Sequence, residues 1–360
     1  MGKDESRRRA TQVVRVKHLY VHFPFCRGKC AYCALPSRPG VPVAERLAYV
    51  TRLAEQLTHE VAPENAAFES IYFGGGTPSW CDLAPLAHAL RPYVNASTEW
   101  TLEANPLDIC AKNLELWRSF GVNRLSMGFQ SVADHTLSAM ARGYSFERGL
   151  QAFQAVKTVF PNAGVDLIVG FPGDPLPQEA DFDWTRLDRL FALEPVHCSV
   201  YSLIVEEESR LGKAVREGRQ VVPSDDAVLD GLARVDEYLT THGLERYEIS
   251  NWARRGKECR YNCAVWRGED YFGLGEGACG RLGRVRQPSG EIVSAEKDAL
   301  ERKLFRLRTR EGLGMDGFPA KVEKLREFVA EGLLTEENSR FVLTRRGMEV
   351  CDSILAELID

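Results

Sequence analysis

Short apolar segments alternate with amphipathic segments over the first two thirds of the chain. The apolar segments are typical of buried strands and cover His18–Phe23, Ser70–Phe73, Trp100–Glu103, Arg124–Phe129, Gly164–Val169 and His197–Leu203. Between the first two, apolar residues recur at every third or fourth position, as in Val43, Leu47, Val50 and Leu53, which predicts a helix with one buried face. Further helical patterns cover Leu83–Leu90, Leu114–Phe120, Ser145–Val159 and Asp183–Leu193.

The repeated order of strand and helix predicts an α/β fold, with a parallel sheet and helices outside it. The sheet is expected to be either flat and doubly wound or curved into a partial barrel, and the pattern alone does not choose between them. Asp82 and Ser145 stand where they would cap two of the helices. In both architectures, ligands gather at the carboxyl ends of the strands.

Glycine-rich and polar motifs follow the predicted strands. They are Gly74–Pro78, Glu103–Pro106, Ser126–Ser131, Asp166–Gly173 and Tyr201–Ser202. Because the carboxyl ends of parallel strands meet at one edge of a sheet, we expect these motifs to surround a single site.

The last third of the chain has a different pattern. A helix is expected over Ser224–Thr241 and a strand over Tyr247–Trp252, followed by a glycine-rich segment that is expected to be mostly loop. Near the C-terminus, a helix, a hairpin around Glu336–Ser339 and a final helix predict a small winged-helix-like α+β domain. The expected division is a flexible tail (1–17), a barrel (18–235), a β and loop extension over the barrel (236–290) and the winged-helix-like domain (291–360).

Composition narrows the possible classes of protein. The 360 residues are 44% hydrophobic and carry a net charge of −5, which is typical of a globular protein that does not bind nucleic acid. No apolar run is long enough to cross a membrane, and the polar start has no signal-peptide core, so a cytoplasmic protein with at most peripheral membrane association is expected. Ten cysteines then suggest a reducing compartment. Cys81, Cys110, Cys198 and Cys351 are expected to be buried apolar thiols.

Three cysteines close to the first strand carry the strongest chemical signal. Cys26, Cys30 and Cys33 have the spacing C-x3-C-x2-C. Three thiolates on one short loop can bind three irons of a 4Fe-4S cluster and leave the fourth iron open to a substrate. Gly28 is expected to allow a tight turn between the first two. Zinc would need a fourth Cys or His nearby, and disulfides are not expected in a reducing compartment.

The wider motifs resemble those of a known superfamily. The cysteine spacing, with Tyr32 before the third cysteine, resembles the radical S-adenosylmethionine enzymes. Tyr20–Cys26, Tyr72–Ser79, Ser126–Ser131, Asp166–Gly173 and Tyr247–Asn251 are similar to the oxygen-independent coproporphyrinogen III oxidase-like family. This resemblance extends from about Lys17 to the C-terminus.

The resemblance implies a partial (βα)6 barrel, with a 4Fe-4S cluster on Cys26, Cys30 and Cys33 and S-adenosylmethionine on its open iron. It also implies which residues contact the cluster and this cofactor: Tyr20, Tyr32, Gly75, Gly76, Thr77, Glu103, Gln130, Arg142 and Asp166. These residue types suit the role, because glycines admit a close ligand, carboxylates accept from ammonium and hydroxyl groups, and arginine pairs with a carboxylate. His22 is close enough to the cysteine loop that packing and function both stay open for it.

Within this family, the chain resembles the heme-chaperone branch more than the oxidases. The oxidases carry a longer N-terminal extension and an extra cysteine at the position of Leu35. A chaperone would bind heme or a similar porphyrin and deliver it to respiratory client proteins, without oxidase activity. The alternatives are a coproporphyrinogen III oxidase, which decarboxylates a porphyrinogen oxidatively, and a radical methyltransferase of the same subfamily.

The chain departs from the chaperone pattern where heme binding is expected. The family histidine and tyrosine of a His-Asn-x-x-Tyr stretch are Tyr261 and Val265 here, and a further family histidine is Cys279. Tyrosine and cysteine can also ligate heme iron, so heme binding with other ligands and its loss both remain open. Cys259, Cys263 and Cys279 are a possible second metal or heme site, with three unrelated loop thiols as the equal alternative.

Overall fold

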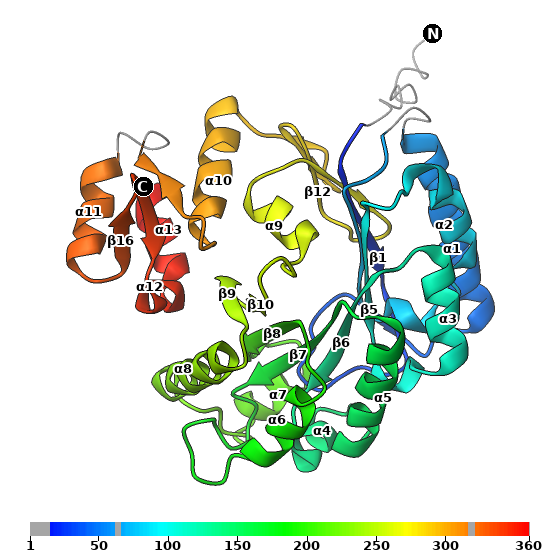
Figure 1. Ribbon diagram of the computed structural model, residues 1–360, viewed down its shortest axis with the longest axis horizontal. Coiled ribbons are helices and arrows are strands. Elements are labelled where there is room, and N and C mark those ends of the chain that lie inside the picture. Colours follow the sequence, from blue (N-terminus) through cyan, green and yellow to red (C-terminus); the bar gives the residue numbers. More distant parts are fainter. Residues whose placement is uncertain (1–14, 62–65, 316–320, 360) are drawn as a thin grey trace.

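The computed structural model describes residues 15–61, 66–315 and 321–359, so most of the expected tail (1–17) lies outside the described residues. Six parallel strands form the centre of the molecule and match the six apolar segments of the sequence (Figure 1). They are β1 (His18–Phe23), β4 (Ser70–Gly75), β5 (Glu99–Ala104), β6 (Arg124–Gln130), β7 (Ala163–Val169) and β8 (His197–Ser202). The prediction of a parallel α/β core is confirmed.

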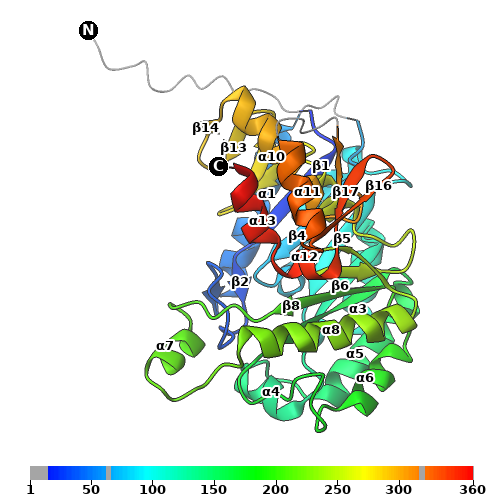
Figure 2. The ribbon, with the colours of Figure 1, turned by 90° about the vertical axis from the view of Figure 1, so that its left-hand side faces the viewer.

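Helices cover the outer face of this sheet, as the amphipathic patterns predict (Figures 1 and 2). The helices that these patterns predict are α1 (Val43–Glu60), α2 (Ala84–Leu90), α3 (Ala111–Phe120), α5 (Phe146–Val159), α6 (Trp184–Phe191) and α8 (Asp225–Thr241). Two short helices that the patterns did not predict, α4 (Asp134–Ala139) and α7 (Arg210–Arg216), follow β6 and β8. In α1, the apolar stripe is buried at Val50, Leu53 and Leu57, whereas Val43 and Leu47 at its start are exposed.

Several helices begin at side-chain caps. Ser145 accepts a hydrogen bond from Arg148 N and caps α5, and Ser224 accepts one from Ala227 N and caps α8. Each such cap stabilises a helix by about 1 kcal/mol. The expected cap at Asp82 is displaced, because α2 has Leu83 as its N-cap residue and Asp82 accepts from Ala84 N.

The segment 236–290 extends the sheet at both edges. At one edge, β10 (Asn251–Ala253) pairs antiparallel with β8 and with β9 (Glu245–Glu248), so the single strand expected over 247–252 is split by a turn. At the other edge, β11 (Tyr271–Leu274) pairs parallel with β1. The short strands that complete this edge are β12 (Gly280–Leu282), β13 (Val285–Gln287) and β14 (Glu291–Ile292). The segment expected to be loop also contains a helix, α9 (Arg260–Trp266).

The C-terminal part has its own core. Helices α10 (Ala295–Leu307), α11 (Val322–Ala330), α12 (Arg345–Glu349) and α13 (Cys351–Ile359) pack with a sheet of β15 (Leu313–Gly314), β16 (Leu334–Glu337) and β17 (Arg340–Leu343). The hairpin around Glu336–Ser339 is therefore confirmed, and the expected final helix is broken into two at Val350. No described helix is long and apolar enough to cross a membrane.

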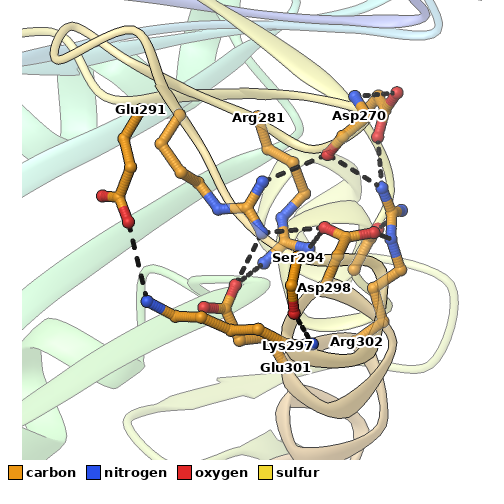
Figure 3. Close-up of polar contacts among 11 residues, drawn as sticks. Asp270, Arg281, Glu291, Ser294, Lys297, Asp298, Glu301 and Arg302 are labelled. Atoms are coloured by element: carbon orange, nitrogen blue, oxygen red, sulfur yellow. Dashed lines mark hydrogen bonds and ion pairs between the residues drawn. The ribbon is translucent and has the colours of Figure 1, made fainter.

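A network of charged side chains attaches α10 to the edge strands (Figure 3). Asp298 on α10 accepts from Arg281 of β12 at 2.8 Å, Arg286 of β13 at 2.7 Å and Arg302 at 2.8 Å. Glu301 accepts from Arg281 and Arg286 at 2.7 Å each. Because Arg281 is buried, these two carboxylates compensate its charge, and the network holds α10 against β12 and β13.

Candidate functional site

A cavity of about 690 Å³ opens at the carboxyl ends of the parallel strands. Its walls come from every one of the six strands or the loops after them. The expected site residues that line it are Cys26, Cys30, Tyr32, Cys33, Gly75, Gly76, Thr77, Glu103, Gln130, Arg142 and Asp166. The topology therefore brings together segments that lie more than a hundred positions apart in the sequence, as Cys26 and Asp166 do.

The cysteine loop is fixed on both sides by backbone hydrogen bonds. Cys26 lies on β2 (Phe25–Cys26), which pairs with β3 (Arg38–Pro39), and Gly40 N donates to Cys26 O at 3.0 Å. In the middle of the loop, Ala31 N donates to Met140 O at 3.0 Å, and Leu211 N of α7 donates to Ala31 O at 2.9 Å. The loop is thus held by α7 and by the end of α4.

The three thiols are of the residue type that ligates a 4Fe-4S cluster. All three are free and partly exposed. Over the residues that the structure describes, no three His, Cys, Asp or Glu side chains come together as one metal ion requires. A 4Fe-4S cluster instead takes its thiolates on separate irons. Burial raises the pKa of the Cys26 thiol, whereas hydrogen bonds from Thr77 and Ser37 oppose this shift.

Two glycines let the chain approach the cysteine loop closely. Gly75 has a φ of 108°, and a Cβ there would lie 2.6 Å from the His22 ring. At Gly76, a Cβ would lie 2.7 Å from Phe25 O and 3.0 Å from Cys26 Sγ, so only glycine fits. The chain bends at Arg27 and Gly28 as expected, but glycine is not required there, because its φ is not left-handed and a Cβ would meet no atom within 4 Å.

Two carboxylates face the cavity from β5 and β7. Glu103 accepts from Tyr72 Oη at 2.7 Å, and Asp166 accepts from Ser126 Oγ at 2.9 Å. Burial, together with the nearby Asp166, raises the pKa of Glu103 to about 7, although the hydrogen bond from Tyr72 favours the ionised form. Burial also raises the pKa of Asp166. The pair suits a cationic or hydroxyl-rich ligand.

Arg142 joins the cysteine loop to β6. Its Nη1 donates to Cys30 Sγ at 3.4 Å and its Nη2 to Gly128 O at 2.9 Å. The Oη of Tyr144 lies 3.4 Å from Arg142 Nε and also donates a hydrogen bond to Phe129 O. The two residues are therefore placed to act on the environment of Cys30.

Tyr20 lies outside the cavity lining. Its ring stacks on Tyr72 at 6.2 Å and on Tyr261 at 5.8 Å between centroids, and its Oη is 3.0 Å from His22 Nδ1. Tyr72, which the sequence reasoning did not single out, connects this stack to Glu103. In the sequence, Tyr72 is marked only as the first residue of the Tyr72–Ser79 motif.

The remaining cysteines are in varied surroundings. Cys259 is fully buried at the N-cap of α9, and Cys263 follows one turn later, with its N–H donating to Cys259 O. Cys279 is exposed beyond β11, and none of these three lines the cavity. Cys110 is exposed at the N-cap of α3, so the expectation that it is buried is wrong. Cys81, Cys198 and Cys351 are buried as expected.

Comparisons with known proteins agree with this geometry. A family model described as "Radical SAM superfamily" matches residues 20–184 of the chain. The chain is 32% identical to the heme chaperone HemW of Mycobacterium tuberculosis, over 95% of this chain and 94% of that protein. It is 29% identical to HemW of Bacillus subtilis over 95% of this chain and all of that protein. The chain belongs to the radical SAM superfamily.

Within that superfamily, it belongs to the family of the heme chaperone HemW. A solved structure of coproporphyrinogen III oxidase from Escherichia coli shares the fold, with a TM-score of 0.78 and 21% identity over 96% of this chain and 90% of that one. Membership of the superfamily implies a 4Fe-4S cluster and S-adenosylmethionine, and the residues lining the cavity fit both.

Proposed function

We propose that this chain is a heme chaperone that holds a 4Fe-4S cluster and S-adenosylmethionine in the large cavity and delivers heme to respiratory proteins. The observation that carries the proposal is the cavity itself, whose lining combines three free cysteines with polar groups from several strand ends. Relatives named heme chaperone HemW, matched over nearly the whole chain, support the same function.

Each side chain in the cavity would have a distinct part. Cys26, Cys30 and Cys33 would ligate three irons, and Gly75 and Gly76, which line the cavity, would contact the methionyl portion of the cofactor. Arg142 would pair with a carboxylate. Glu103 and Asp166 would accept from ammonium or hydroxyl groups, as would the amide oxygen of Gln130. When bound, the cluster would supply one-electron chemistry, and the surrounding residues would orient S-adenosylmethionine for it.

Heme would rest at the mouth of the cavity. Four of the large apolar side chains exposed to solvent line this cavity: Leu35, Leu107, Tyr201 and Ile204. Such a patch suits a flat apolar macrocycle. Tyr261, which replaces the family histidine, is held in the aromatic stack with Tyr20 and does not line the cavity. The proposed heme site therefore depends on apolar contacts and not on a ligand at position 261.

The test is anaerobic reconstitution, followed by titration with heme and with coproporphyrinogen III while 5′-deoxyadenosine is monitored. We expect stoichiometric heme binding and no conversion of coproporphyrinogen III. Turnover of the porphyrinogen would establish the oxidase instead, and transfer of a methyl group from S-adenosylmethionine would establish the methyltransferase.

A pair of variants tests the heme site. Ile204→Ser removes an apolar group from the mouth and should weaken heme binding by about tenfold, because roughly 1.5 kcal/mol of apolar contact is lost. Val221→Ser is the matched control, since Val221 is also exposed but does not line the cavity. Equal affinity in the two variants would contradict the proposed site.

A further inference from the structure

A second cavity, of about 280 Å³, lies where the barrel meets the C-terminal helices. Its walls come from β8 and α8 on one side and from α12 and α13 on the other. Ser202 at the end of β8 is shared with the large cavity. Otherwise the two cavities have different linings, so the site described above does not account for the second one.

Three arginines from three separate elements line this second cavity. Arg246 is on β9, Arg308 follows α10 and Arg345 begins α12. Such convergence of guanidinium groups is typical of sites that bind carboxylate or phosphate.

The charges of two of these arginines are incompletely matched. The ion pairs of Arg345 are long, at 3.5 Å to Glu237 and 4.0 Å to Asp236. Arg308 pairs with Asp352, yet its Nε and the Nη2 of Arg345 are buried without an acceptor among the described residues. A buried donor without an acceptor costs about 1–3 kcal/mol, so the protein leaves these two guanidinium groups incompletely satisfied.

Arg246 is the most enclosed of the three. Its Nε donates to Ile249 O at 3.0 Å, its guanidinium lies 4.7 Å from the centre of the Trp252 ring, and it forms no ion pair within the described part of the chain. Burial lowers the pKa of Arg246. The nearby carboxylates of Asp236, Glu248 and Glu349 oppose this shift, and the guanidinium stays charged.

The lining itself holds fewer acids than arginines, although Asp236 and Glu237 pair with Arg345 from outside the lining. Asp352 is engaged with Arg308, and Glu349 is the only other acid in the lining. Val350 and the first residues of α13, Cys351 to Ser353, also line the cavity. The first-turn N–H groups of a helix lack intrahelical acceptors and favour negative charge, which adds to the arginines.

We propose that this cavity binds a small organic oxyanion with a compact apolar body. The oxyanion is a carboxylate or a phosphate monoester, and when bound it links the C-terminal domain to the barrel. The arginines and the start of α13 would hold the charged group. The apolar body would contact the rest of the lining, which includes Val200, Leu229, Leu232, Trp252 and Met348. This inference is independent of heme binding.

Calorimetric titration of the reconstituted full-length protein, saturated with S-adenosylmethionine at constant ionic strength, tests the proposal. The probes are phenyl phosphate, benzoate, inorganic phosphate and phenol. We expect one equivalent of phenyl phosphate or benzoate to bind more tightly than inorganic phosphate, and phenol not to bind. Whichever of the two aromatic anions binds more tightly shows whether the preferred charged group is a phosphate or a carboxylate.

Matched variants separate this site from general attraction of anions. Arg345→Gln should weaken binding at least about tenfold through the lost charged hydrogen bonds. Arg346→Gln makes the same charge change on the next residue, which does not line the cavity, and should bind as the wild type does. Ala233→Phe should also weaken binding, because it fills the cavity without changing a charge.

The proposal is overturned if neither aromatic anion binds the wild-type protein. It is equally overturned if inorganic phosphate binds as tightly as phenyl phosphate and benzoate, which would indicate an adventitious ion only. Unchanged affinity in Ala233→Phe, or equal affinity in Arg345→Gln and Arg346→Gln, would place any bound anion elsewhere.

Discussion

At the scale of single residues, burial and polar neighbours set the chemistry of the large cavity. Glu103 has a pKa of about 7 because it is buried near Asp166. Arg142 donates to the sulfur of Cys30, and hydrogen bonds to cluster sulfurs are one means by which proteins tune reduction potentials. Glu103 can change its charge near neutral pH, whereas Arg142 stays charged, so pH acts on the cavity through Glu103.

Affinity for S-adenosylmethionine should depend on pH through Glu103. Above pH 7 the side chain is ionised and attracts a cationic ligand, whereas below pH 7 it is protonated, so the dissociation constant should rise up to about tenfold per pH unit. The protonated side chain also stabilises the fold below its unfolded pKa, and this contribution is lost as the pH rises through about 7. Binding measured from pH 6 to pH 8 checks the slope. Glu103→Gln should remove this dependence of the dissociation constant on pH. A dependence that persists in the variant would mean that another group causes it.

Gly76→Ala should disturb the cysteine loop. The added methyl group would collide with Phe25 O and press on Cys26 Sγ, which should destabilise the protein by about 1–3 kcal/mol and reduce the iron bound after reconstitution. Gly28→Ala is the control within the same loop, because its methyl group would meet no atom within 4 Å. Equal iron content in the two variants would show that the close approach at Gly76 is not required.

At the scale of elements, the apolar pattern predicted the six parallel strands because buried strands are short, apolar and separated by amphipathic helices. The same reasoning missed α9, whose sequence from Arg260 to Trp266 is rich in residues with modest helix propensity and has no clear apolar stripe. The strand expected over 247–252 is split because the chain turns between β9 and β10, and the pattern carries no signal for that turn.

The charged network on α10 should contribute strongly to stability. Asp298→Asn would leave Arg281, which is buried, with Glu301 as its carboxylate partner, and should lower the free energy of unfolding by about 3 kcal/mol. Glu291→Gln removes the exposed pair with Lys297 (Figure 3) and should change stability by less than about 0.5 kcal/mol. Chemical denaturation of both variants checks this. Similar decreases in the free energy of unfolding of the two variants would mean that burial of the network does not add to its effect on stability.

At the scale of the whole molecule, the parallel topology explains why the site could largely be predicted from sequence. Carboxyl ends of parallel strands must meet at one edge, so the cysteine loop, Gly75–Thr77, Glu103 and Asp166 gather in one cavity. The sequence could not place Tyr20, because the strand pairing that sets it opposite Tyr72, in a stack away from the cavity, exists only in the folded chain. The second cavity was not predicted, because its arginines meet only where the C-terminal domain packs against the barrel.

The central claim is that Cys26, Cys30 and Cys33 hold a cluster with one open iron facing the residues that bind S-adenosylmethionine. The most direct measurement is electron paramagnetic resonance of the reduced, reconstituted protein with and without S-adenosylmethionine. We predict about four irons per chain and a spectrum that changes when the cofactor is added. Each cysteine-to-serine change at these three positions should abolish the signal, and the same change at Cys263 or Cys279 should preserve it. A spectrum that the cofactor leaves unchanged would contradict the account.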